Sequence, residues 1–346
     1  MPNPPLVSII IVTWNSKTHL QRCLAALLSQ TIQNFEVIII DNGSTDGSVN
    51  TVENDYPNLD MRIQRLDSNF GFAAANNIGA RLARGRWLAL LNADAFPEMD
   101  WLEKFIKATE EYPAFSCFSS CQIQANHPEF LDGTGDSYHV SGVAWRRNIN
   151  YPVHQSGSNI EEIFSPCAAA SFYLRDAFLE VGGFDEDFFS YFEDVDLGFR
   201  LRLRGYRSLY VPDAVVHHIG SASLGVNSNF SLYHSHRNLV WTFFKNMPTA
   251  LLLKYLPAHI MINLSYALYY TFRGRGKVLW KAKWDAICDL PSILKKRNEI
   301  QKKRTIDNSI LKSYMEHNWL QLVFRDRRHQ HISARKNGGD NRIVDT

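Results

Sequence analysis

The sequence predicts an α/β fold: a mainly parallel central sheet flanked by helices, followed by a helical C-terminal extension. Short, unbroken apolar runs alternate with helix-like segments over the first hundred residues. Strands of this kind are typical of a parallel sheet that helices cover on both faces. A chain of 346 residues is long enough for two domains. Its content of 45% hydrophobic and 21% charged residues excludes wholesale disorder.

The predicted elements follow one another in a regular order. Apolar, β-branched runs predict strands at residues 6–13, 35–40, 61–66 and 87–91. Apolar residues at helical spacing predict helices at 19–30 and 73–83, with a shorter helix running through Val52. Further strands are expected within 115–174 and at 206–218, a charged helix within 178–205, and helices beyond Tyr233. The alternation in the first hundred residues predicts strand–helix–strand units with parallel strands.

Ligands of such sheets bind outside the carboxyl ends of the strands. That rule points to the loops at 13–16, 41–48, 69–77 and 92–97. Asp41 directly follows a predicted strand, so its carboxylate can accept a hydrogen bond from a base or a ribose. The alternative is that Asp41, Ser44 and Asp46 only form a turn and cap a helix.

The 69–79 segment opens a helix with small residues, which permits a ligand to approach the backbone closely. It lacks the GxGxxG pattern and follows the third predicted strand instead of the first. The sequence therefore does not predict a dinucleotide-binding site.

Asp94 and His218 are candidate metal ligands. Asp94 closely follows the strand at 87–91, and oxygen ligands in a loop suit Mg²⁺ or Mn²⁺ that also bridges substrate phosphates. The imidazole of His218 suits Mn²⁺ better than Mg²⁺. The alternative is that Asp94 caps a helix and that His217 and His218 are one exposed and one interior histidine.

Three carboxylates, those of Glu193, Asp194 and Asp196, lie at the start of a predicted helix. Acidic residues in a first turn are stabilised by the helix dipole, and this alone would account for exposed side chains. Phenylalanine and tyrosine residues surround these acids in the sequence, however, and burial raises the pKa of a carboxyl group. We therefore expect at least one of the three to act as a general base.

The polar motifs, taken in order, resemble those of glycosyltransferase family 2. They are Val12-Thr13-Trp14-Asn15, the acidic turn 41–48, the 69–77 segment, Leu91-Asn92-Ala93-Asp94, Gly182-Gly183-Phe184-Asp185-Glu186, Glu193-Asp194-Val195-Asp196 and His218-x-Gly220-x-x-Ser223. The resemblance covers residues 6–248, about two thirds of the chain, and is strongest to the bacterial rhamnosyltransferase-like branch.

This resemblance implies a GT-A fold and an inverting transfer from a nucleoside-diphosphate sugar, with dTDP-rhamnose favoured and a UDP-sugar possible. Carried over by position, Thr13, Asn15 and Asp41 hold the base and ribose, while the segment containing Asn69, Gly71, Ala75 and Asn77 lines the donor pocket. Asn92-Ala93-Asp94 stands at the Asp-x-Asp metal motif, where Asn92 replaces the first aspartate. The resemblance makes Asp94 and His218 the ligands of Mn²⁺ or Mg²⁺, Asp194 the general base, and Glu193 the residue that orients the acceptor.

The formal net charge of +2 conceals an uneven distribution. Residues 1–272 sum to −8 and residues 273–346 to +10. Eleven basic residues lie within 273–304. Trp280 and Trp284 share helical spacing in that basic segment, a combination that suits an anionic membrane surface. The alternative is an ordinary solvated helix face, and the acidic body argues against nucleic acid as a partner.

We expect a cytoplasmic protein, peripheral on the inner face of the bacterial plasma membrane, that acts on a lipid-linked glycan acceptor. Five scattered cysteines suggest reduced thiols, the N-terminus lacks a secretory signal pattern, and Lys254, Pro257, His259 and Asn263 interrupt the long apolar stretch at 249–272. Arg237 and Asn238 are candidates for contacting the acceptor phosphates, with helix surface as the alternative role.

The predicted domains are a glycosyltransferase domain at 1–245, a basic helical extension at 246–335 and a disordered end at 336–346. The first would divide into a nucleotide-sugar half at 1–110 and an acceptor half at 111–245. The alternative functions are a sugar-nucleotide nucleotidylyltransferase and a non-catalytic glycan-binding protein. The first would need a glycine-rich basic loop at 13–16, which the sequence lacks, and Asp94, Asp194 and His218 argue against the second.

Overall fold

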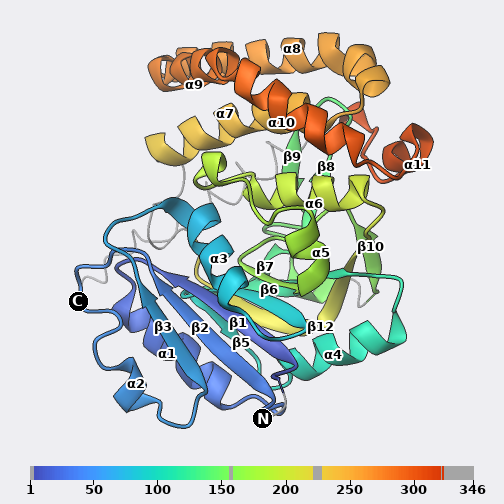
Figure 1. Cartoon of the computed structure of the whole chain (residues 1–346). Coiled ribbons are helices and arrows are strands. Elements are labelled where there is room, and N and C mark those ends of the chain that lie inside the picture. The colour runs from blue at the N-terminus through green and yellow to red at the C-terminus, as the bar shows by residue number, and fades with distance from the viewer. Residues whose placement is uncertain (1–3, 156–158, 221–227, 321, 323–346) are drawn as a thin grey trace, which may run out of the picture.

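The computed structural model describes residues 4–155, 159–220, 228–320 and 322. A twisted sheet with helices on both faces forms the lower part of the molecule in Figure 1, and a layer of helices from the C-terminal part of the chain lies above it. The predicted disordered end at 336–346 and the motif residue Ser223 lie outside the described residues.

The first part of the chain forms a four-stranded parallel unit. Its strands are β1 (Val7–Thr13), β2 (Phe35–Asp41), β3 (Met61–Arg65) and β4 (Trp87–Asn92), in the order β3-β2-β1-β4. Three helices belong to it: α1 (Lys17–Leu28), α2 (Val52–Asp55) and α3 (Gly71–Leu82). The parallel register pairs Thr13 with Asp41, so the ends of β1 and β2 reach the same edge of the sheet.

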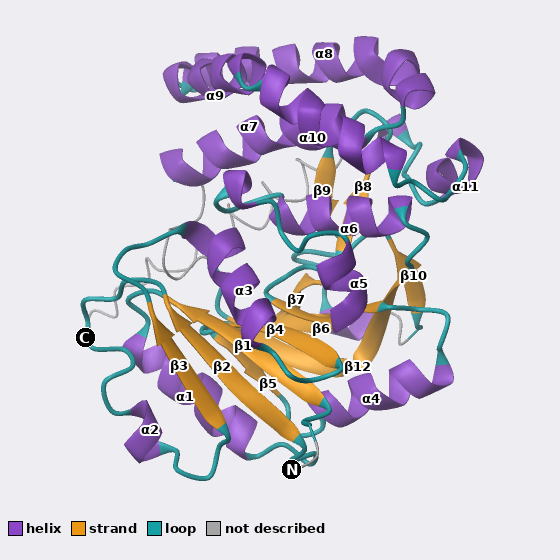
Figure 2. Ribbon diagram, viewed as in Figure 1, coloured by secondary structure: helices purple, strands orange, loops and turns teal. Residues whose placement is uncertain are grey.

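Successive side chains of a strand point to opposite faces, and the apolar runs of this unit fill both faces. Ile9 and Ile11 of β1 belong to one buried cluster with Leu24 of α1. Ile10 belongs to a second cluster with Ala75 and Ala80 of α3. The continuous hydrophobicity of the strands therefore reflects a sheet covered on both sides, as Figure 2 shows.

The sheet continues beyond β4 with strands of mixed direction. Within the described residues it has ten strands, ordered β10-β12-β6-β11-β4-β1-β2-β3, with β5 on β12 and β7 on β6. These strands are β5 (Ala95–Pro97), β6 (Cys117–Gln124), β7 (His127–Gly133), β10 (Glu161–Ile163), β11 (Ala170–Leu174) and β12 (Ser208–His218). A separate hairpin is formed by β8 (Asp136–Tyr138) and β9 (Ala144–Arg146). β11 is antiparallel to both of its neighbours, while β6 and β12 are parallel.

Helices complete both parts of the chain. They are α4 (Trp101–Glu111), α5 (Arg175–Glu180), α6 (Glu193–Leu203), α7 (Asn229–Asn246), α8 (Thr249–Phe272), α9 (Gly276–Cys288), α10 (Leu290–Lys302) and α11 (Asn308–Ser313), with short 3₁₀ turns at Val153–Gln155 and Glu186–Phe188. The helices from α7 onward form the upper layer in Figure 1. The domain boundary predicted at 245 coincides with the end of α7 and stays a prediction.

Several of the eleven basic residues counted in the 273–304 segment contact the rest of the protein. Lys296 pairs with Asp185 at 2.5 Å, and Arg297 donates to the carbonyl of Phe244 at 2.9 Å. Lys283 is buried and donates to the carbonyl of His236 at 2.7 Å. Lys283 and Arg297 join the upper helices to one another, and both are buried, so they are not available to a surface. Lys296 joins α10 to Asp185, beside the 186–188 turn.

Two predicted boundaries differ from the structure. The helix expected to run through Val52 instead begins there and spans only four residues, because the acidic turn before it occupies the chain up to that point. The helix expected from Ala73 begins at Gly71, which brings that glycine into its first turn. The second difference matters because the start of α3 lies next to the loop that precedes α6.

Candidate active site

Asp94 and His218 meet at the edge of the sheet. His218 ends β12 and Asp94 follows β4, and β12 pairs with β5 directly after Asp94. The Nε2 atom of His218 lies 3.3 Å from Oδ1 of Asp94 and 3.4 Å from the amide nitrogen of Asn92. The structure thus brings together the two candidate metal ligands and Asn92, which are 126 positions apart in the chain at their widest.

Asp132, at the end of β7, binds the other nitrogen of the His218 ring. Its Oδ2 lies 2.8 Å from Nδ1 of His218 and 2.7 Å from a guanidinium nitrogen of Arg146. Burial alone would lower the pKa of His218, but the hydrogen bonds to Asp132 and Asp94 raise it to about 9. Burial would raise the pKa of Asp132, but Arg146 and His218 together lower it to about 2.

This donor set fits a divalent cation whose remaining ligands come from a substrate. A carboxylate oxygen and an imidazole nitrogen face each other, and a second carboxylate holds the far side of the ring, as is usual for metal-binding histidines. The described residues contain no group of three or more histidine, cysteine and acidic side chains arranged to hold a metal by themselves. Such an incomplete set is typical of metals that bridge protein and substrate phosphates.

A strained loop presents Glu193 and Asp194 at the start of α6. Phe189, Tyr191 and Phe192 all have positive φ angles, of 64°, 69° and 67°. Non-glycine residues in this region each cost about 1–3 kcal/mol and persist where the surroundings hold them, often at functional sites. Glu193 is buried, whereas Asp194 keeps a partly exposed edge. Asp194 is therefore the more accessible of the two carboxylates.

Asp194 interacts with two buried acidic residues, Asp136 and Glu193, and with Arg146. Its Oδ1 and Oδ2 accept from the backbone of Val195 at 2.9 Å and of Ala168 at 3.3 Å. Burial raises the pKa of Asp194, and the positive charge of Arg146 opposes that rise. Burial and the charge of Asp194 also raise the pKa values of Glu193 and Asp136.

One oxygen each of Asp136 and Glu193 is buried without a hydrogen-bond partner. A buried polar atom in that state costs free energy unless something else binds it. Arg146 pairs with Asp132 and interacts electrostatically with Asp136 and Asp194. It thus links the carboxylate–histidine pair to Asp136 and Asp194.

Asn238 and Arg237, on α7, hold the strained loop. Asn238 is fully buried, and its amide donates to the carbonyls of Phe188, Ser190 and Tyr191 at 3.0, 3.1 and 2.7 Å. Arg237 stacks 4.0 Å above the Trp241 ring and donates to the carbonyl of Asp187 at 3.0 Å. The alternatives considered for these two residues, contact with acceptor phosphates or an ordinary helix surface, both miss this role.

The loops after β1 and β2 are tied to each other. Asn15, with a φ of 50°, accepts from the backbone of Thr45 at 2.8 Å, and Asp41 accepts from the backbone of Ser44 at 3.0 Å. Asp46 accepts from the backbone of Lys17, the first residue of α1, at 3.1 Å. The turn-forming alternative is therefore correct for part of this segment. Its role in nucleotide binding stays a prediction.

Asn42, which the sequence reasoning did not single out, fastens the start of α3. Its amide donates to Asn69 at 2.9 Å and its oxygen accepts from the backbone of Phe70 at 2.9 Å. Gly71 has a φ of +87°, and a Cβ atom there would lie 2.7 Å from the ring of Phe189. A glycine is therefore required where the 69–77 segment contacts the loop before α6.

The other predicted donor-pocket residues lie deeper in the fold. Ala75 and Ala93 are buried in the two main hydrophobic clusters. Asn77 holds the turn at Phe184 with hydrogen bonds of 2.8 Å in both directions. Thr13 is buried at the end of β1, and its hydroxyl has no hydrogen-bond partner. Their part in donor binding stays a prediction.

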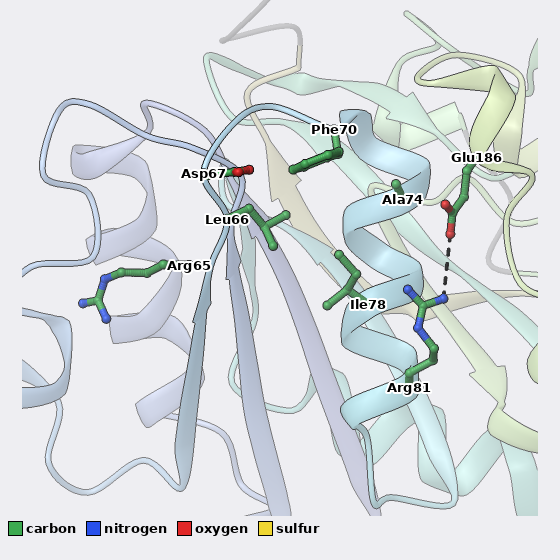
Figure 3. Close-up of a pocket in the computed structure, with 8 residues that line it drawn as sticks. All are labelled: Arg65, Leu66, Asp67, Phe70, Ala74, Ile78, Arg81 and Glu186. Atoms are coloured by element: carbon green, nitrogen blue, oxygen red, sulfur yellow. Dashed lines mark ion pairs between the residues drawn. The ribbon is translucent and has the colours of Figure 1, made fainter.

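A pocket of about 440 Å³ lies beside α3. Figure 3 shows its lining, which is Arg65, Leu66, Asp67, Phe70, Ala74, Ile78, Arg81 and Glu186. Arg81 and Glu186 form an exposed ion pair of 3.7 Å there. Phe70 and Ala74 belong to the predicted donor segment 69–77, whereas Asp94, Asp194 and His218 do not line this pocket.

The sequence reasoning missed Asp132, Asp136 and Arg146. The first two belong to the segment Asp132-Gly133-Thr134-Gly135-Asp136, in which glycines separate two acidic residues at the end of a strand. That pattern is a usable signal for a polar site. Nothing local marks Arg146, whose position follows from the pairing of β9 with β8.

The sheet and its flanking helices form a GT-A fold. The structure resembles the mannosyltransferase PcManGT of Pyrobaculum calidifontis in complex with GDP-Man and Mn²⁺, with a TM-score of 0.54, 17% identity, and coverage of 90% of this chain and 86% of that one. It also resembles residues 1–349 of S. aureus TarS, with a TM-score of 0.52, 16% identity, and coverage of 86% and 90%. At these identities the likeness concerns the fold alone.

A family model described as "Glycosyl transferase family 2" matches residues 8–182, and the chain belongs to this family. An N-acetylglucosaminyl-diphospho-decaprenol L-rhamnosyltransferase of Mycobacterium tuberculosis strain H37Rv is 29% identical over 67% of this chain and 82% of its own length. An uncharacterized protein of Sinorhizobium fredii is 30% identical over 65% of this chain. The chain spans only 26% of that protein. The predicted family and the similarity to a rhamnosyltransferase are confirmed.

Proposed function

We propose that the protein is an inverting, metal-dependent glycosyltransferase. In this proposal it moves a sugar from a nucleoside-diphosphate donor to a hydroxyl group of a glycan acceptor. One observation carries the proposal. Arg146 pairs with Asp132, which holds His218 beside Asp94, and Arg146 also interacts electrostatically with Asp194. The Asp94–His218 pair, which can bind a diphosphate through a cation, thus belongs to the same polar network as Asp194, which can accept a proton.

In the proposed reaction, Asp194 accepts the proton of the acceptor hydroxyl as that oxygen attacks the anomeric carbon. Burial raises its pKa above that of an ordinary aspartate, which makes it a better proton acceptor once ionised. Glu193, buried behind it, orients the acceptor. Asp94 and His218 would hold Mn²⁺ or Mg²⁺, which when bound neutralises charge on the departing diphosphate. A single displacement of this kind inverts the anomeric configuration.

We further propose a rhamnose-like sugar from dTDP-rhamnose as the favoured donor, with a UDP-sugar as the alternative, and a lipid-linked glycan as acceptor. The M. tuberculosis relative supports rhamnose and a lipid-linked acceptor through its name, which describes transfer of L-rhamnose to a sugar on a diphospho-decaprenol carrier. The choice of dTDP follows from the family resemblance. The assay is a panel of nucleotide sugars with Mn²⁺, read as release of nucleoside diphosphate. Release from at least one donor supports the proposal, while release from none contradicts it.

We also propose that the protein acts as a peripheral protein on the inner face of the bacterial plasma membrane. Large apolar side chains are exposed on α8 and α9, which pack against each other. They are Leu253, Ile260, Met261, Leu264, Leu268, Tyr269, Phe272, Trp280, Trp284 and Ile287, called here the α8–α9 apolar face. Large exposed apolar patches mark interaction surfaces.

The charges around the α8–α9 apolar face support an anionic lipid surface. Lys254, Arg273, Lys277 and Lys281 are exposed on these helices, and Asp285 is the only acidic residue between 249 and 288. Each basic residue near such a membrane is worth about 1 kcal/mol. By length and composition, α8 alone among the described helices could also span a membrane, although 22% of its most apolar window is buried in the protein.

Sedimentation with vesicles tests this surface. We expect the protein to bind phosphatidylglycerol-containing vesicles and to bind pure phosphatidylcholine weakly. The double variant Leu264→Asp/Leu268→Asp should lose binding. Met99→Asp alters a side chain that is 62% exposed outside this face and serves as the matched control. Equal binding by all three proteins, or a dimer that the double variant dissociates, would contradict the membrane proposal.

A further inference from the structure

We propose that Asp132 and Arg146 are positioning residues that orient His218 toward the metal site. This inference rests on the proposed function, because it concerns how the proposed cation is held. Neither residue belongs to the motifs on which the resemblance rests. Asp132 contacts His218, and Arg146 contacts Asp132.

The geometry of Asp132 gives it control of the His218 ring. His218 is 4% exposed, so its ring cannot turn freely, and Nδ1 lies 2.8 Å from Oδ2 of Asp132. A carboxylate at this position accepts a hydrogen bond from Nδ1–H, so that the neutral ring carries its lone pair on Nε2. Nε2 is the nitrogen that faces Asp94, at 3.3 Å. Asp132 thereby selects the tautomer that a cation beside Asp94 requires.

Arg146 in turn fixes Asp132. One guanidinium nitrogen lies 2.7 Å from the same Oδ2 atom that accepts from His218. The path of this side chain is built into the hairpin, since a Cβ atom on Gly133 would lie 2.4 Å from its Cδ and Cγ atoms. In the register of the hairpin Arg146 is also paired with Asp136. Gly133 therefore leaves the space through which Arg146 reaches Asp132.

A second carboxylate–histidine pair on the same strand supplies the contrast. His217 precedes His218 on β12, and its Nε2 lies 3.2 Å from Oε1 of Glu98. The side chains of that pair are 33% and 48% exposed, and His217 points to the opposite face of the strand from His218, since neighbouring side chains alternate. Glu98→Gln therefore makes the same chemical change as Asp132→Asn beside a histidine that has no part in the site.

The test is titration of Mn²⁺ into the protein with saturating dTDP or UDP, whichever the wild type binds more tightly, followed by calorimetry or by the electron paramagnetic resonance of free Mn²⁺. Outer-sphere partners of a metal-bound histidine are worth about 10–100-fold in metal affinity. We expect a loss of that order in Asp132→Asn. A smaller loss is expected in Arg146→Lys, which keeps the positive charge but lacks the planar guanidinium group. Glu98→Gln should bind Mn²⁺ like the wild type.

The outcomes separate the two levels of the proposal. If the wild type binds no Mn²⁺ with either nucleotide, the metal dependence in the proposed function fails and this inference fails with it. If the wild type binds Mn²⁺ and folded Asp132→Asn binds it within twofold of the same affinity, only the positioning role is wrong. If Asp132→Asn does not fold, the Mn²⁺ affinity of Arg146→Lys decides. An affinity equal to that of the wild type would show that Asp132 and Arg146 do not position His218.

Discussion

The side-chain amide of Asn238 lies 2.7 Å from the carbonyl oxygen of Tyr191, to which it donates a hydrogen bond across 47 positions of the chain. It donates to two further carbonyls of the same loop. Tyr191 and its neighbour Phe192 both have positive φ angles, and Glu193 follows them directly. A buried residue of α7 thus keeps the loop before α6 in a conformation that presents the candidate general base.

Asn238→Ala should therefore reduce both stability and transfer. Three carbonyls lose their donor, and unsatisfied buried polar groups cost about 1–3 kcal/mol. Urea denaturation measures the stability, and kcat measures the presentation of Asp194. Ser235→Ala, a partly exposed position on the same helix, is the control and should change neither quantity. A folded Asn238→Ala protein with unchanged kcat would show that the loop does not depend on this clamp.

Gly71→Ala should weaken nucleotide binding because the added methyl group overlaps the ring of Phe189. Gly182 is the matched control: its φ of +86° nearly equals the +87° of Gly71, but a Cβ there meets nothing within 4 Å. Both substitutions carry the left-handed backbone cost of about 1–2 kcal/mol. Only Gly71→Ala should also raise the Kd for the nucleoside diphosphate, measured by calorimetry. Equal Kd values in the two variants would show that the contact between Gly71 and Phe189 has no part in donor binding.

The rate of transfer should fall at acidic pH, with a midpoint above the ordinary aspartate value of 3.8. A general base works only when ionised, so kcat/KM decreases as pH falls through its pKa. Burial raises the pKa of Asp194, which moves this decrease to higher pH. Because Glu193 and Asp136 interact with Asp194, the measured midpoint belongs to the three groups together. A pH profile that stays flat down to 3.8 would rule out a buried carboxylate as the base.

Lys283→Met should stabilise the protein more at pH 7 than at pH 9. Burial lowers the pKa of Lys283 from 10.5 to about 7, so the unfolded chain holds this proton between those values while the folded chain releases it. Stability therefore rises with pH across that window, by about 1.4 kcal/mol per pH unit, and is lost as pH falls. Urea denaturation of wild type and variant at both pH values measures the difference.

Lys277→Met, at an exposed position of the same helix, is the control for this comparison. It should change the free energy of unfolding equally at pH 7 and pH 9. If Lys283→Met behaves in the same way, the buried lysine is charged throughout the window and the argument from burial is wrong.

The sequence was sufficient for the parallel unit and for the loops at its edge. The apolar runs that became β1, β2, β3 and β4 are long, β-branched and separated by helical periodicity, so local signals agree with the fold. Asp94 could be located for the same reason, since it follows a buried strand closely. His218 required a further step, because the pairing of β12 with β5 brings it to Asp94.

The rest of the site depends on contacts that no local pattern encodes. Arg146 reaches Asp132 through a two-stranded hairpin, and Asn238 reaches the 188–191 loop from a helix about fifty positions away. The basic segment shows the opposite limit: its composition suggested a surface, whereas Lys283 and Arg297 are buried by packing between helices. A run of charged residues therefore does not show which of their side chains are exposed, because packing between helices can bury the long side chains of lysine and arginine.

The configuration of the product tests the central claim most directly. The donor that the panel identifies would be incubated with Mn²⁺ and a short lipid-linked glycan, and the anomeric configuration of the new linkage determined by NMR. Single displacement with Asp194 as base predicts an inverted centre, so a β-configured donor gives an α-linked product, and predicts that Asp194→Asn binds the donor but forms no product. Retention of configuration, or full transfer by folded Asp194→Asn, would contradict the account.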